Sequence, residues 1–216
     1  MKQPSTFITR SGTDRAATRH EPWRILEERT VYDAGDWFRV ALHKVRLPDG
    51  RIIGDYHQIY MPDYVTLLAR TADGRFVMVR KYNHGYRKVN LLMPGGMRHA
   101  REPLGRAAAR ELLEETGYAA RRWTRLGVFM PHSNYGCGRV HIMLGEECRC
   151  VAAPQPCDLE RITVHILTEP ELMAELRSGR NPSLSDRTAL LLLQEQRVAG
   201  ARRQTTGRKQ SQRKRG

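Results

Sequence analysis

The sequence lacks any long apolar stretch. Its longest uninterrupted apolar run, residues 189–193, is five residues long, whereas a helix needs about 20 predominantly apolar residues to cross a bilayer. A membrane-spanning helix is therefore excluded. The first residues are polar and lack the apolar core of a secretory signal peptide. We therefore expect a cytoplasmic protein.

Cysteine is also scarce: the chain has four, at Cys137, Cys148, Cys150 and Cys157. Disulfide frameworks are typical of secreted chains, for which the N-terminus gives no sign. Zinc sites commonly use a C-x2-C spacing, and the closest pair here, Cys148 and Cys150, is separated by one residue only. We therefore expect free thiols in a reducing compartment.

Acidic residues are missing altogether from the C-terminal segment. The whole chain has 37 Lys and Arg against 23 Asp and Glu, a net charge of +14, and residues 201–216 supply seven of the basic residues and no acid. A like-charged run without large apolar side chains is typical of a disordered tail. Such a tail could also make weak, non-specific contact with nucleic acid through counterion release. The sequence leaves both interpretations open.

The length of 216 residues suits one domain or one domain with a small addition. Changes in composition along the chain divide it into four segments. These are a polar N-terminal extension (1–21), a β-rich segment (22–60), a main domain (61–198) and a disordered basic tail (199–216).

Hydrophobic patterning predicts the elements within these segments. Alternating or continuous apolar residues predict strands at 37–45, 52–60, 64–69, 76–79, 126–130, 139–144 and 162–167, with a polar loop at 81–90. Helix formers and capping signals predict helices at 103–117, 168–179 and 184–198. Strands interspersed with helices indicate an α/β fold, a mixed β-sheet with helices on its faces.

Three glutamates lie close together on the first predicted helix. Glu111, Glu114 and Glu115 are spaced i, i+3 and i+4, so they share one face. Like charges at these spacings destabilise a helix by about 0.2–0.5 kcal/mol per pair, and the single Arg110 cannot neutralise all three. A solvated acidic face is one interpretation. The other is a site for a hard divalent cation such as Mg²⁺, which prefers carboxylate oxygens.

The sequence around these glutamates favours the metal site. Residues 96–118 read GMRHAREPLGRAAARELLEETGY, which fits G-x5-E-x7-R-E-U-x-E-E-x-G-U (U, aliphatic) at eight of its nine defined positions. Tyr118, in the last aliphatic place, is the departure. The segment resembles the Nudix box. The resemblance implies a Nudix-type α/β/α sandwich with a mixed sheet, preceded by the small N-terminal β segment, and the activity of a Nudix hydrolase.

The resemblance also implies roles for residues of the box. Mg²⁺, for which Mn²⁺ could substitute, would be held by the catalytic glutamates Glu111, Glu114 and Glu115 and by the carbonyl of Gly95. Glu102 and Arg110 match the ion pair that steadies the loop against the helix in this family.

The resemblance extends over about residues 22–195 to the ADP-ribose and nucleoside-diphosphate-sugar pyrophosphatase branch of the family. The matching pieces include L-P-D-G at 47–50, V-R-K-Y at 79–82 and P-G-G before the box. This branch implies a homodimer formed through the 22–60 segment. The chain departs from it at Asn83 and Leu92, where the branch usually has Arg and Glu, so the particular substrate stays open.

The same branch takes its catalytic base from a loop after the box, which corresponds to residues 151–159 here. Asp158 in that loop and Glu160 just beyond it are the candidates, although either could be an ordinary solvated loop charge. Three polar residues before the box could contact the substrate: Asn83, His84 and Arg87.

These features together predict Mg²⁺-dependent hydrolysis of the pyrophosphate bond in a nucleoside diphosphate linked to a sugar or a similar group. One alternative is an RNA pyrophosphohydrolase or decapping enzyme of the same family, for which the basic tail would supply RNA affinity. The other is a non-enzymatic nucleotide-sensing module. Such modules usually lose box carboxylates, which this chain keeps.

Overall fold

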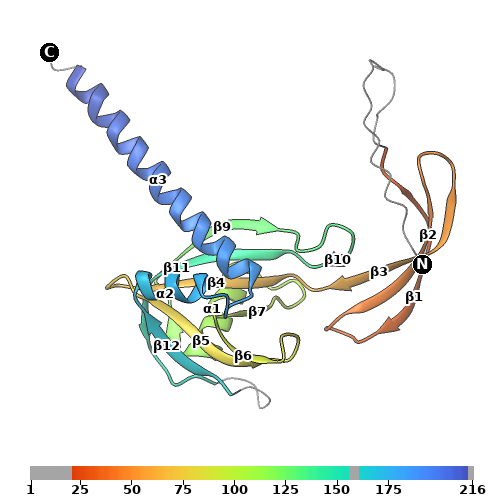
Figure 1. Ribbon diagram of the computed structural model, residues 1–216, viewed down its shortest axis with the longest axis horizontal. Coiled ribbons are helices and arrows are strands. Elements are labelled where there is room, and N and C mark those ends of the chain that lie inside the picture. Colours follow the sequence, from red (N-terminus) through yellow and green to blue (C-terminus); the bar gives the residue numbers. More distant parts are fainter. Residues whose placement is uncertain (1–20, 156–160, 214–216) are drawn as a thin grey trace.

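The computed structural model describes residues 21–155 and 161–213. Its strands form two sheets that lie end to end, a four-stranded N-terminal sheet and an eight-stranded central sheet (Figure 1). The chain passes from one to the other at Pro62 and Asp63, between the last long strand of the first sheet and the first strand of the second.

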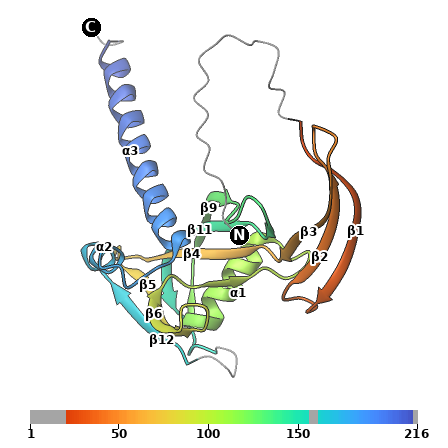
Figure 2. The ribbon, with the colours of Figure 1, turned by 45° about the vertical axis from the view of Figure 1, so that its right-hand side comes forward.

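The N-terminal sheet is an antiparallel meander of β1 (Arg24–Asp33), β2 (Arg39–Arg46) and β3 (Ile52–Met61). The short β10 (Gly136–Cys137) adds to β3 in parallel and ties the sheet to the central part of the chain. The predicted turn at residues 47–50 joins β2 to β3, and Gly50 there has φ +87°, a conformation that favours glycine. The sheet curves away from the rest of the molecule as a single layer (Figure 2).

The central sheet has the strand order β12-β5-β4-β11-β8, with β6 on β5, β7 on β4 and β9 on β11. Only β4 and β11 run parallel; the other pairs are antiparallel, which confirms the predicted mixed sheet. The strands are β4 (Tyr64–Thr71), β5 (Phe76–Asn83), β6 (Lys88–Leu92), β7 (Gly95–Met97), β8 (Tyr118–Ala119), β9 (Arg122–Phe129), β11 (Val140–Cys150) and β12 (Thr163–Leu167).

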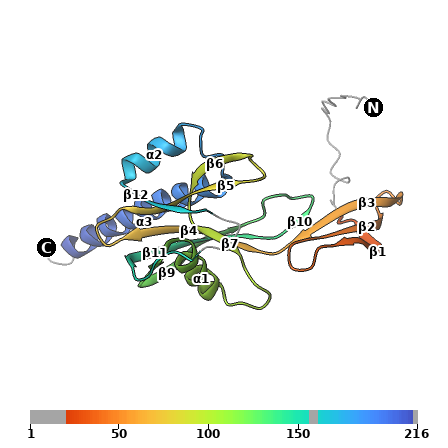
Figure 3. The same cartoon turned by 90° about the horizontal axis from the view of Figure 1, so that it is seen from below.

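Helices cover both faces of this sheet, as the predicted α/β/α sandwich requires (Figure 3). On one face, α1 (Leu104–Thr116) buries Ala107, Ala108 and Leu112 against β4. On the other, α2 (Glu169–Arg177) and α3 (Leu184–Arg213) contribute leucines to a second core that includes Phe76. The apolar stripe of each helix therefore faces the sheet, and the two cores lie on its two sides.

The boundaries of α1 follow from its terminal residues. Pro103 precedes the first turn with extended geometry, and proline is tolerated there because its missing N–H has no intrahelical acceptor. Gly117 ends the helix at φ +72°, its amide donating to the Leu113 carbonyl at 2.8 Å. A side chain at Gly117 would collide with the backbone of Ala152, so glycine is needed at this end.

Two differences from the sequence prediction concern residues 81–92 and β1. The predicted polar loop at 81–90 is a hairpin instead, because β5 continues to Asn83 and β6 begins at Lys88. The sequence pattern does not predict β1, since its side chains are almost all exposed and charged residues interrupt its apolar ones. A strand stabilised mainly by backbone pairing carries little hydrophobic signal.

The last helix differs most. The sequence predicts an end near Val198 and a disordered tail at 199–216, whereas α3 continues to Arg213. Residues 199–213 contain no proline, and their Ala, Arg, Gln and Lys favour a helix; Gly200 and Gly207 each disfavour it by only about 1 kcal/mol. The helix projects well beyond the sheets (Figure 1). No helix of the described residues is long and apolar enough to cross a membrane.

Candidate active site

The loop that precedes α1 lies flat against β4. Gly95 and Gly96 in β7 pair with Thr66 and Val65 of β4, and the Leu67 amide donates to the Pro94 carbonyl at 2.9 Å. Gly95 has φ +152°, and a Cβ at this position would collide with the Val65 carbonyl. Glycine is therefore required for the loop to approach β4 so closely.

The same two glycines touch the glutamates of α1. The Gly95 amide donates to Oε2 of Glu115 at 2.8 Å, and a Cβ on Gly96 would collide with the carboxylate of Glu111. The backbone of the loop and two carboxylates of the helix are thus in direct contact. The box resemblance implies a cation site formed by these carboxylates and the Gly95 carbonyl; the contacts seen here bring the amide of Gly95 and the backbone of Gly96 to the carboxylates.

The three box glutamates differ in exposure. Glu111 and Glu115 are 9% and 5% exposed, while the side chain of Glu114 is 47% exposed. Burial raises the pKa of Glu111, because a carboxylate removed from water is less stable in its charged form, and its acidic neighbours add to this while Arg110 opposes it. Two of the three carboxylates therefore carry a desolvation cost that a cation could offset.

Lys81 at the end of β5 reaches one of these buried carboxylates. Its Nζ lies 2.5 Å from Oε1 of Glu115, and the two side chains are 15% and 6% exposed. Lys81 belongs to the V-R-K-Y stretch, but the family resemblance implies no role for it. The available signal was a lysine shortly after the apolar run 76–79, which predicts a strand.

Arg110 joins the helix to the loop before it. Its Nε and Nη2 donate to Oε1 and Oε2 of Glu102, each at 3.0 Å, and Nη2 also donates to the Met97 carbonyl at 3.0 Å. Its Nη1 lies 2.8 Å from Glu111 and 3.2 Å from Glu114. The guanidinium lowers the pKa of Glu102. The geometry is that of the structural ion pair that the resemblance implied.

The donor set suits a hard cation such as Mg²⁺, since it consists of carboxylate and carbonyl oxygens. In the part of the chain that the structure describes, no three His, Cys, Asp or Glu side chains are gathered closely enough to hold a metal ion. Lys81 and Arg110 instead contact the carboxylates. The assignment of Gly95 and the box glutamates as metal ligands therefore stays a prediction.

The other predicted site residues fall into two groups. Asn83 ends β5, and His84 and Arg87 lie in the turn that follows, at the edge of the sheet. Their hydrogen bonds are local: Asn83 Nδ2 donates to the Lys81 carbonyl at 3.2 Å, and the Arg87 amide donates to the His84 carbonyl at 3.1 Å. Asp158 and Glu160 lie outside the described residues.

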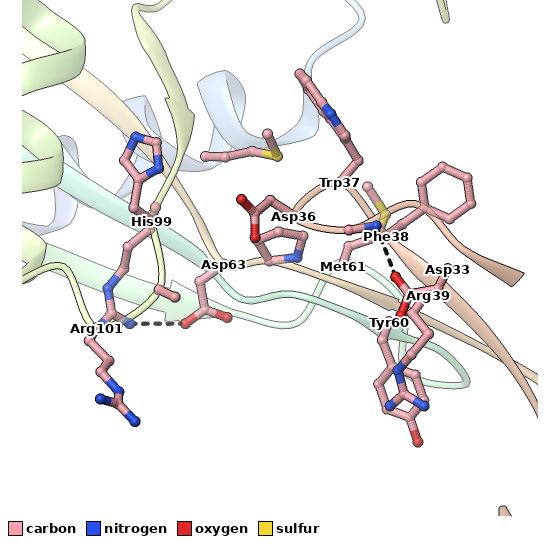
Figure 4. A pocket seen from close by; sticks show the side chains of 15 residues that line it. Asp33, Asp36, Trp37, Phe38, Arg39, Tyr60, Met61, Asp63, His99 and Arg101 are labelled. Atoms are coloured by element: carbon pink, nitrogen blue, oxygen red, sulfur yellow. Dashed lines mark hydrogen bonds and ion pairs between the residues drawn. The ribbon is translucent and has the colours of Figure 1, made fainter. Parts of the chain in front are cut away.

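A pocket of about 970 Å³ lies between the N-terminal sheet and the loop of the box. One wall carries Trp37, Phe38 and Tyr60, and the opposite wall carries His99 and Arg101 from the loop between β7 and α1 (Figure 4). The indole of Trp37 is 66% exposed. Flat aromatic side chains facing basic ones suit a ligand that combines a planar ring with phosphate. Asp33, Asp36 and Asp63 also line the pocket and can accept hydrogen bonds from hydroxyl groups.

Comparison with known families divides the chain at the same place as the two sheets. Residues 23–59 match the nucleoside diphosphate sugar hydrolase N-terminal domain. Residues 61–182 match the NUDIX domain. The second match covers the central sheet, α1 with its glutamates, and α2.

Two curated proteins are similar to this chain in sequence. An ADP-ribose pyrophosphatase of Bacillus subtilis (strain 168) is 29% identical over 126 residues, covering 56% of this chain and 68% of that protein. A CMP-5'-(N-acetyl-N-hydroxy-3-aminopropyl)phosphonate hydrolase of Streptomyces rubellomurinus (strain ATCC 31215) is 29% identical over 182 residues, covering 84% of this chain and 86% of that protein.

Among solved structures, the crystal structure of an ADP compounds hydrolase superposes with a TM-score of 0.74 at 20% identity. The match covers 86% of this chain and all of the other. At this identity the likeness establishes the fold alone.

Proposed function

The chain belongs to the Nudix family and is a Nudix hydrolase, and from that premise we propose that it cleaves the pyrophosphate bond of a nucleoside diphosphate joined to a sugar or a similar group. The observation that carries the proposal is the contact of two nearly buried carboxylates, Glu111 and Glu115, with the backbone of Gly95 and Gly96. Burying acidic side chains lowers the stability of a fold. Their presence at this loop is explained if they bind a cation and, through it, the phosphate groups of a substrate.

The class of substrate is supported by the N-terminal segment and by the relatives. Residues 23–59 match a domain named for nucleoside diphosphate sugar hydrolases. The two relatives act, by their names, on ADP-ribose and on a CMP-linked phosphonate, so both take a nucleotide that carries a further group. The shared feature is the nucleotide, and the group beyond it is what differs.

The cation would be held by Glu111, Glu114, Glu115 and the Gly95 carbonyl; when bound, Mg²⁺ neutralises phosphate charge and makes water a better nucleophile. The chain's own residues do the rest. Arg110 holds the loop against α1 and so fixes the spacing of these oxygens. Asp158 or Glu160 takes the proton of the attacking water as a general base.

Two regions of the chain supply the substrate contacts. The pocket in Figure 4 receives the nucleoside or the sugar, with Trp37 and Phe38 against a ring and His99 and Arg101 near phosphate. In the other region, Asn83, His84 and Arg87 of the β5–β6 turn contact the remaining phosphate or sugar hydroxyls. Each of these residue types donates hydrogen bonds suited to phosphate.

Two partners belong to the same proposal. A second copy of the chain covers the N-terminal sheet, whose exposed apolar side chains include Ile25, Tyr32 and Ile52; exposed apolar groups of this kind mark interfaces. The basic C-terminal residues 201–216 make weak, non-specific contact with nucleic acid, which their seven positive charges favour at low salt.

The test is a panel of substrates assayed for phosphorylated products with and without Mg²⁺. The panel contains ADP-ribose, GDP-mannose, UDP-glucose, a CMP ester, NADH, a dinucleoside polyphosphate and capped RNA. We expect two phosphate-bearing products from a nucleoside-diphosphate-linked compound, and none without the metal. Turnover of capped RNA alone, abolished by removing residues 201–216, would favour the RNA alternative instead.

The catalytic base is assigned by two substitutions outside the described residues. Of Asp158→Asn and Glu160→Gln, the one that removes the base should lower kcat with little change in KM, since a base matters only in the transition state. The other substitution should have a small effect. Equal, small effects of both would place the base among the box glutamates.

A further inference from the structure

A third buried carboxylate, besides those of Glu111 and Glu115, lies on the opposite face of the sheet from α1. Asp186, in the first turn of α3, is 2% exposed. Its Oδ2 accepts hydrogen bonds from the Met93 amide at 2.9 Å and from Nδ2 of Asn181 at 2.8 Å, and its Oδ1 accepts one from Oγ of Ser183 at 2.8 Å. Burial raises the pKa of Asp186. Its polar partners offset part of the cost of burying an acid.

Ser183 caps α3, because its Oγ accepts a hydrogen bond from the Asp186 amide at 3.2 Å, but the carboxylate of Asp186 does not complete the cap. Ser183 and Asp186 have the spacing of a capping box, in which the acid normally bonds to the amide of the first capping residue. Here the Ser183 amide donates to Oδ1 of Asn181 at 2.9 Å. Asn181 thus takes over the capping bond and leaves the carboxylate of Asp186 for the Met93 amide.

The neighbouring helix has the ordinary arrangement. At the start of α2, Oε2 of Glu171 accepts the amide of Thr168 at 2.7 Å, and the carboxylate stays exposed at the surface. An acidic residue at this position can therefore accept the capping hydrogen bond while it remains exposed to solvent. The burial of Asp186 goes with its additional contact to Met93.

Met93 leads directly into the loop of the box. Pro94 follows it with a fixed φ, its carbonyl accepts the Leu67 amide at 2.9 Å, and Gly95 comes next with its amide on Glu115 at 2.8 Å. Asn181 reaches the same stretch from the other end, donating to the Leu91 carbonyl at 3.0 Å. A shift of Met93 would be passed through the rigid proline to the two glycines.

We propose that Asp186 is a positioning residue for the active site: together with Asn181, it holds the backbone at Met93 so that Gly95 and Gly96 lie against Glu115 and Glu111. The start of α3 is thereby coupled to a loop on the other face of the sheet. The inference rests on the proposed role of those glutamates and of the Gly95 carbonyl in cation binding.

The test compares Asp186→Ala with Glu171→Ala in the full chain. Both substitutions remove the acid at the same position of a helix cap, but Glu171 has no hydrogen bond to the box loop among the described residues. Two quantities decide: amide hydrogen exchange at Gly95 and Gly96, and the binding of Mn²⁺ measured directly in the absence of substrate. Both are taken well below the melting temperature of each variant.

We expect Asp186→Ala to speed exchange at Gly95 and Gly96 and to weaken Mn²⁺ binding about 10-fold, the lower end of what residues that orient metal ligands contribute. Glu171→Ala should leave both quantities unchanged even where it lowers Tm. Asp186→Asn, which keeps the size and one acceptor oxygen, should fall between the parent and Asp186→Ala, and it serves if the alanine variant does not fold.

Parent-like exchange at Gly95 and Gly96 in both Asp186 variants would overturn the proposal. Faster exchange with unchanged Mn²⁺ binding would support the hold on Met93 but count against the metal role of the loop, so the two proposals fail separately. In activity assays, the loss should be relieved in part by higher Mg²⁺, whereas a purely structural role would leave the Mg²⁺ requirement of the folded fraction unchanged.

Discussion

The two sheets of this protein are stabilised in different ways. Strand β4 of the central sheet has five consecutive buried residues between two helical layers, whereas β1 of the N-terminal sheet has none among its ten. The central sheet therefore gains its stability from apolar burial on both faces. In the N-terminal sheet the buried residues lie on β2, at Ala41, His43 and Val45, so β1 must depend on other contacts.

Polar cross-strand contacts provide some of them. Glu28 on β1 accepts a hydrogen bond from Arg39 of β2 at 2.7 Å and one from Oη of Tyr60 on β3 at 3.0 Å, while the guanidinium of Arg39 lies 4.2 Å from the centre of the Tyr60 ring. Pairs of this kind contribute roughly 0.2–1 kcal/mol each. Such a sheet is modestly stable alone and gains most from a partner.

The largest expected effect concerns the chemistry of the central sheet. Glu115→Gln should lower kcat/KM by more than about 100-fold, beyond the 10–100-fold typical of residues that only orient metal ligands. The amide can still accept the Gly95 hydrogen bond, and removing one charge relieves repulsion on α1. The charge pairing with Lys81 is lost, so Tm should fall while the fold persists at the assay temperature. Assays at several Mg²⁺ concentrations, with circular dichroism, check both parts.

The matched control is Glu114→Gln, which changes the exposed glutamate of the same triplet. Its effect should be clearly smaller, because an exposed carboxylate is less committed to one geometry. If Glu115→Gln kept full turnover at saturating Mg²⁺, the assignment of Glu115 as a ligand would be wrong.

The second prediction tests what covers the N-terminal sheet. Ile25→Lys places a charge on an exposed apolar position of β1 and should weaken the proposed dimer by about 2 kcal/mol, or roughly 30-fold in Kd, the loss typical of a central interface residue. Sedimentation equilibrium measures the change. Leu191→Lys, at a comparably exposed leucine of α3, should leave the association unchanged; an equal loss in both would refute a specific role for β1.

The third prediction compares a partly buried ion pair with a more exposed one. Glu102→Gln removes the charge paired with Arg110 and should lower the free energy of unfolding at pH 7 by about 1.5 kcal/mol, or roughly 3–6 °C in Tm for a chain of this size. Glu28→Gln, in the more exposed pair with Arg39, should lower Tm less.

The difference in stability between the parent protein and Glu102→Gln should depend on pH through the pKa of Glu102. Arg110 lowers that pKa in the folded protein below the ordinary value of 4.5. The unfolded state therefore binds more protons on acidification, and the stabilisation is present above the ordinary pKa and lost as the pH falls through the folded one. Tm measured from pH 7 to pH 3 should converge for the parent and Glu102→Gln. A constant difference would show that packing rather than charge is responsible.

The contrast between the sheets also explains what the sequence could predict. The apolar runs of β4 and β5 and the stripe of α1 carry strong signals, because burial on both faces requires them. The box motif determines how far apart Glu111, Glu115 and the two glycines lie in the sequence, so the motif predicts that they lie close together in the fold. Strand β1 carries no comparable signal, since backbone pairing is independent of side chains.

Other features depend on contacts between distant parts of the chain. The contact of Lys81 with Glu115 joins residues on β5 and α1, and that of Asp186 with Met93 joins residues 93 positions apart. The spacing of Ser183 and Asp186 predicts a helix cap, but nothing local indicates that Asn181 replaces the acid in it. Such contacts depend on tertiary packing and cannot be predicted from the local sequence pattern.

The smallest effect on stability and turnover is expected from the C-terminal end of α3, which projects beyond both sheets (Figure 1). Among residues 184–199 of α3, whose side chains the structure describes, the last buried one is Leu193, and residues 195–199 are exposed. Deleting residues 201–216 should therefore change the free energy of unfolding by less than about 0.5 kcal/mol, as exposed changes generally do. Turnover of a small nucleotide should also be unchanged at saturation.

What the deletion should change is the response to salt. The segment carries seven positive charges and no acid, and both nucleotides and nucleic acids are anionic, so its loss should weaken nucleic-acid binding at low salt and reduce the salt-sensitive part of kcat/KM. Both differences should fade above 0.1 M salt, where the Debye length is about 10 Å. None of the five residues before Gly200 is buried, so they do not anchor this end of α3 to the core. Loss of all small-nucleotide hydrolysis at every salt concentration would contradict this expectation and mean that this end of α3 is part of the folded enzyme.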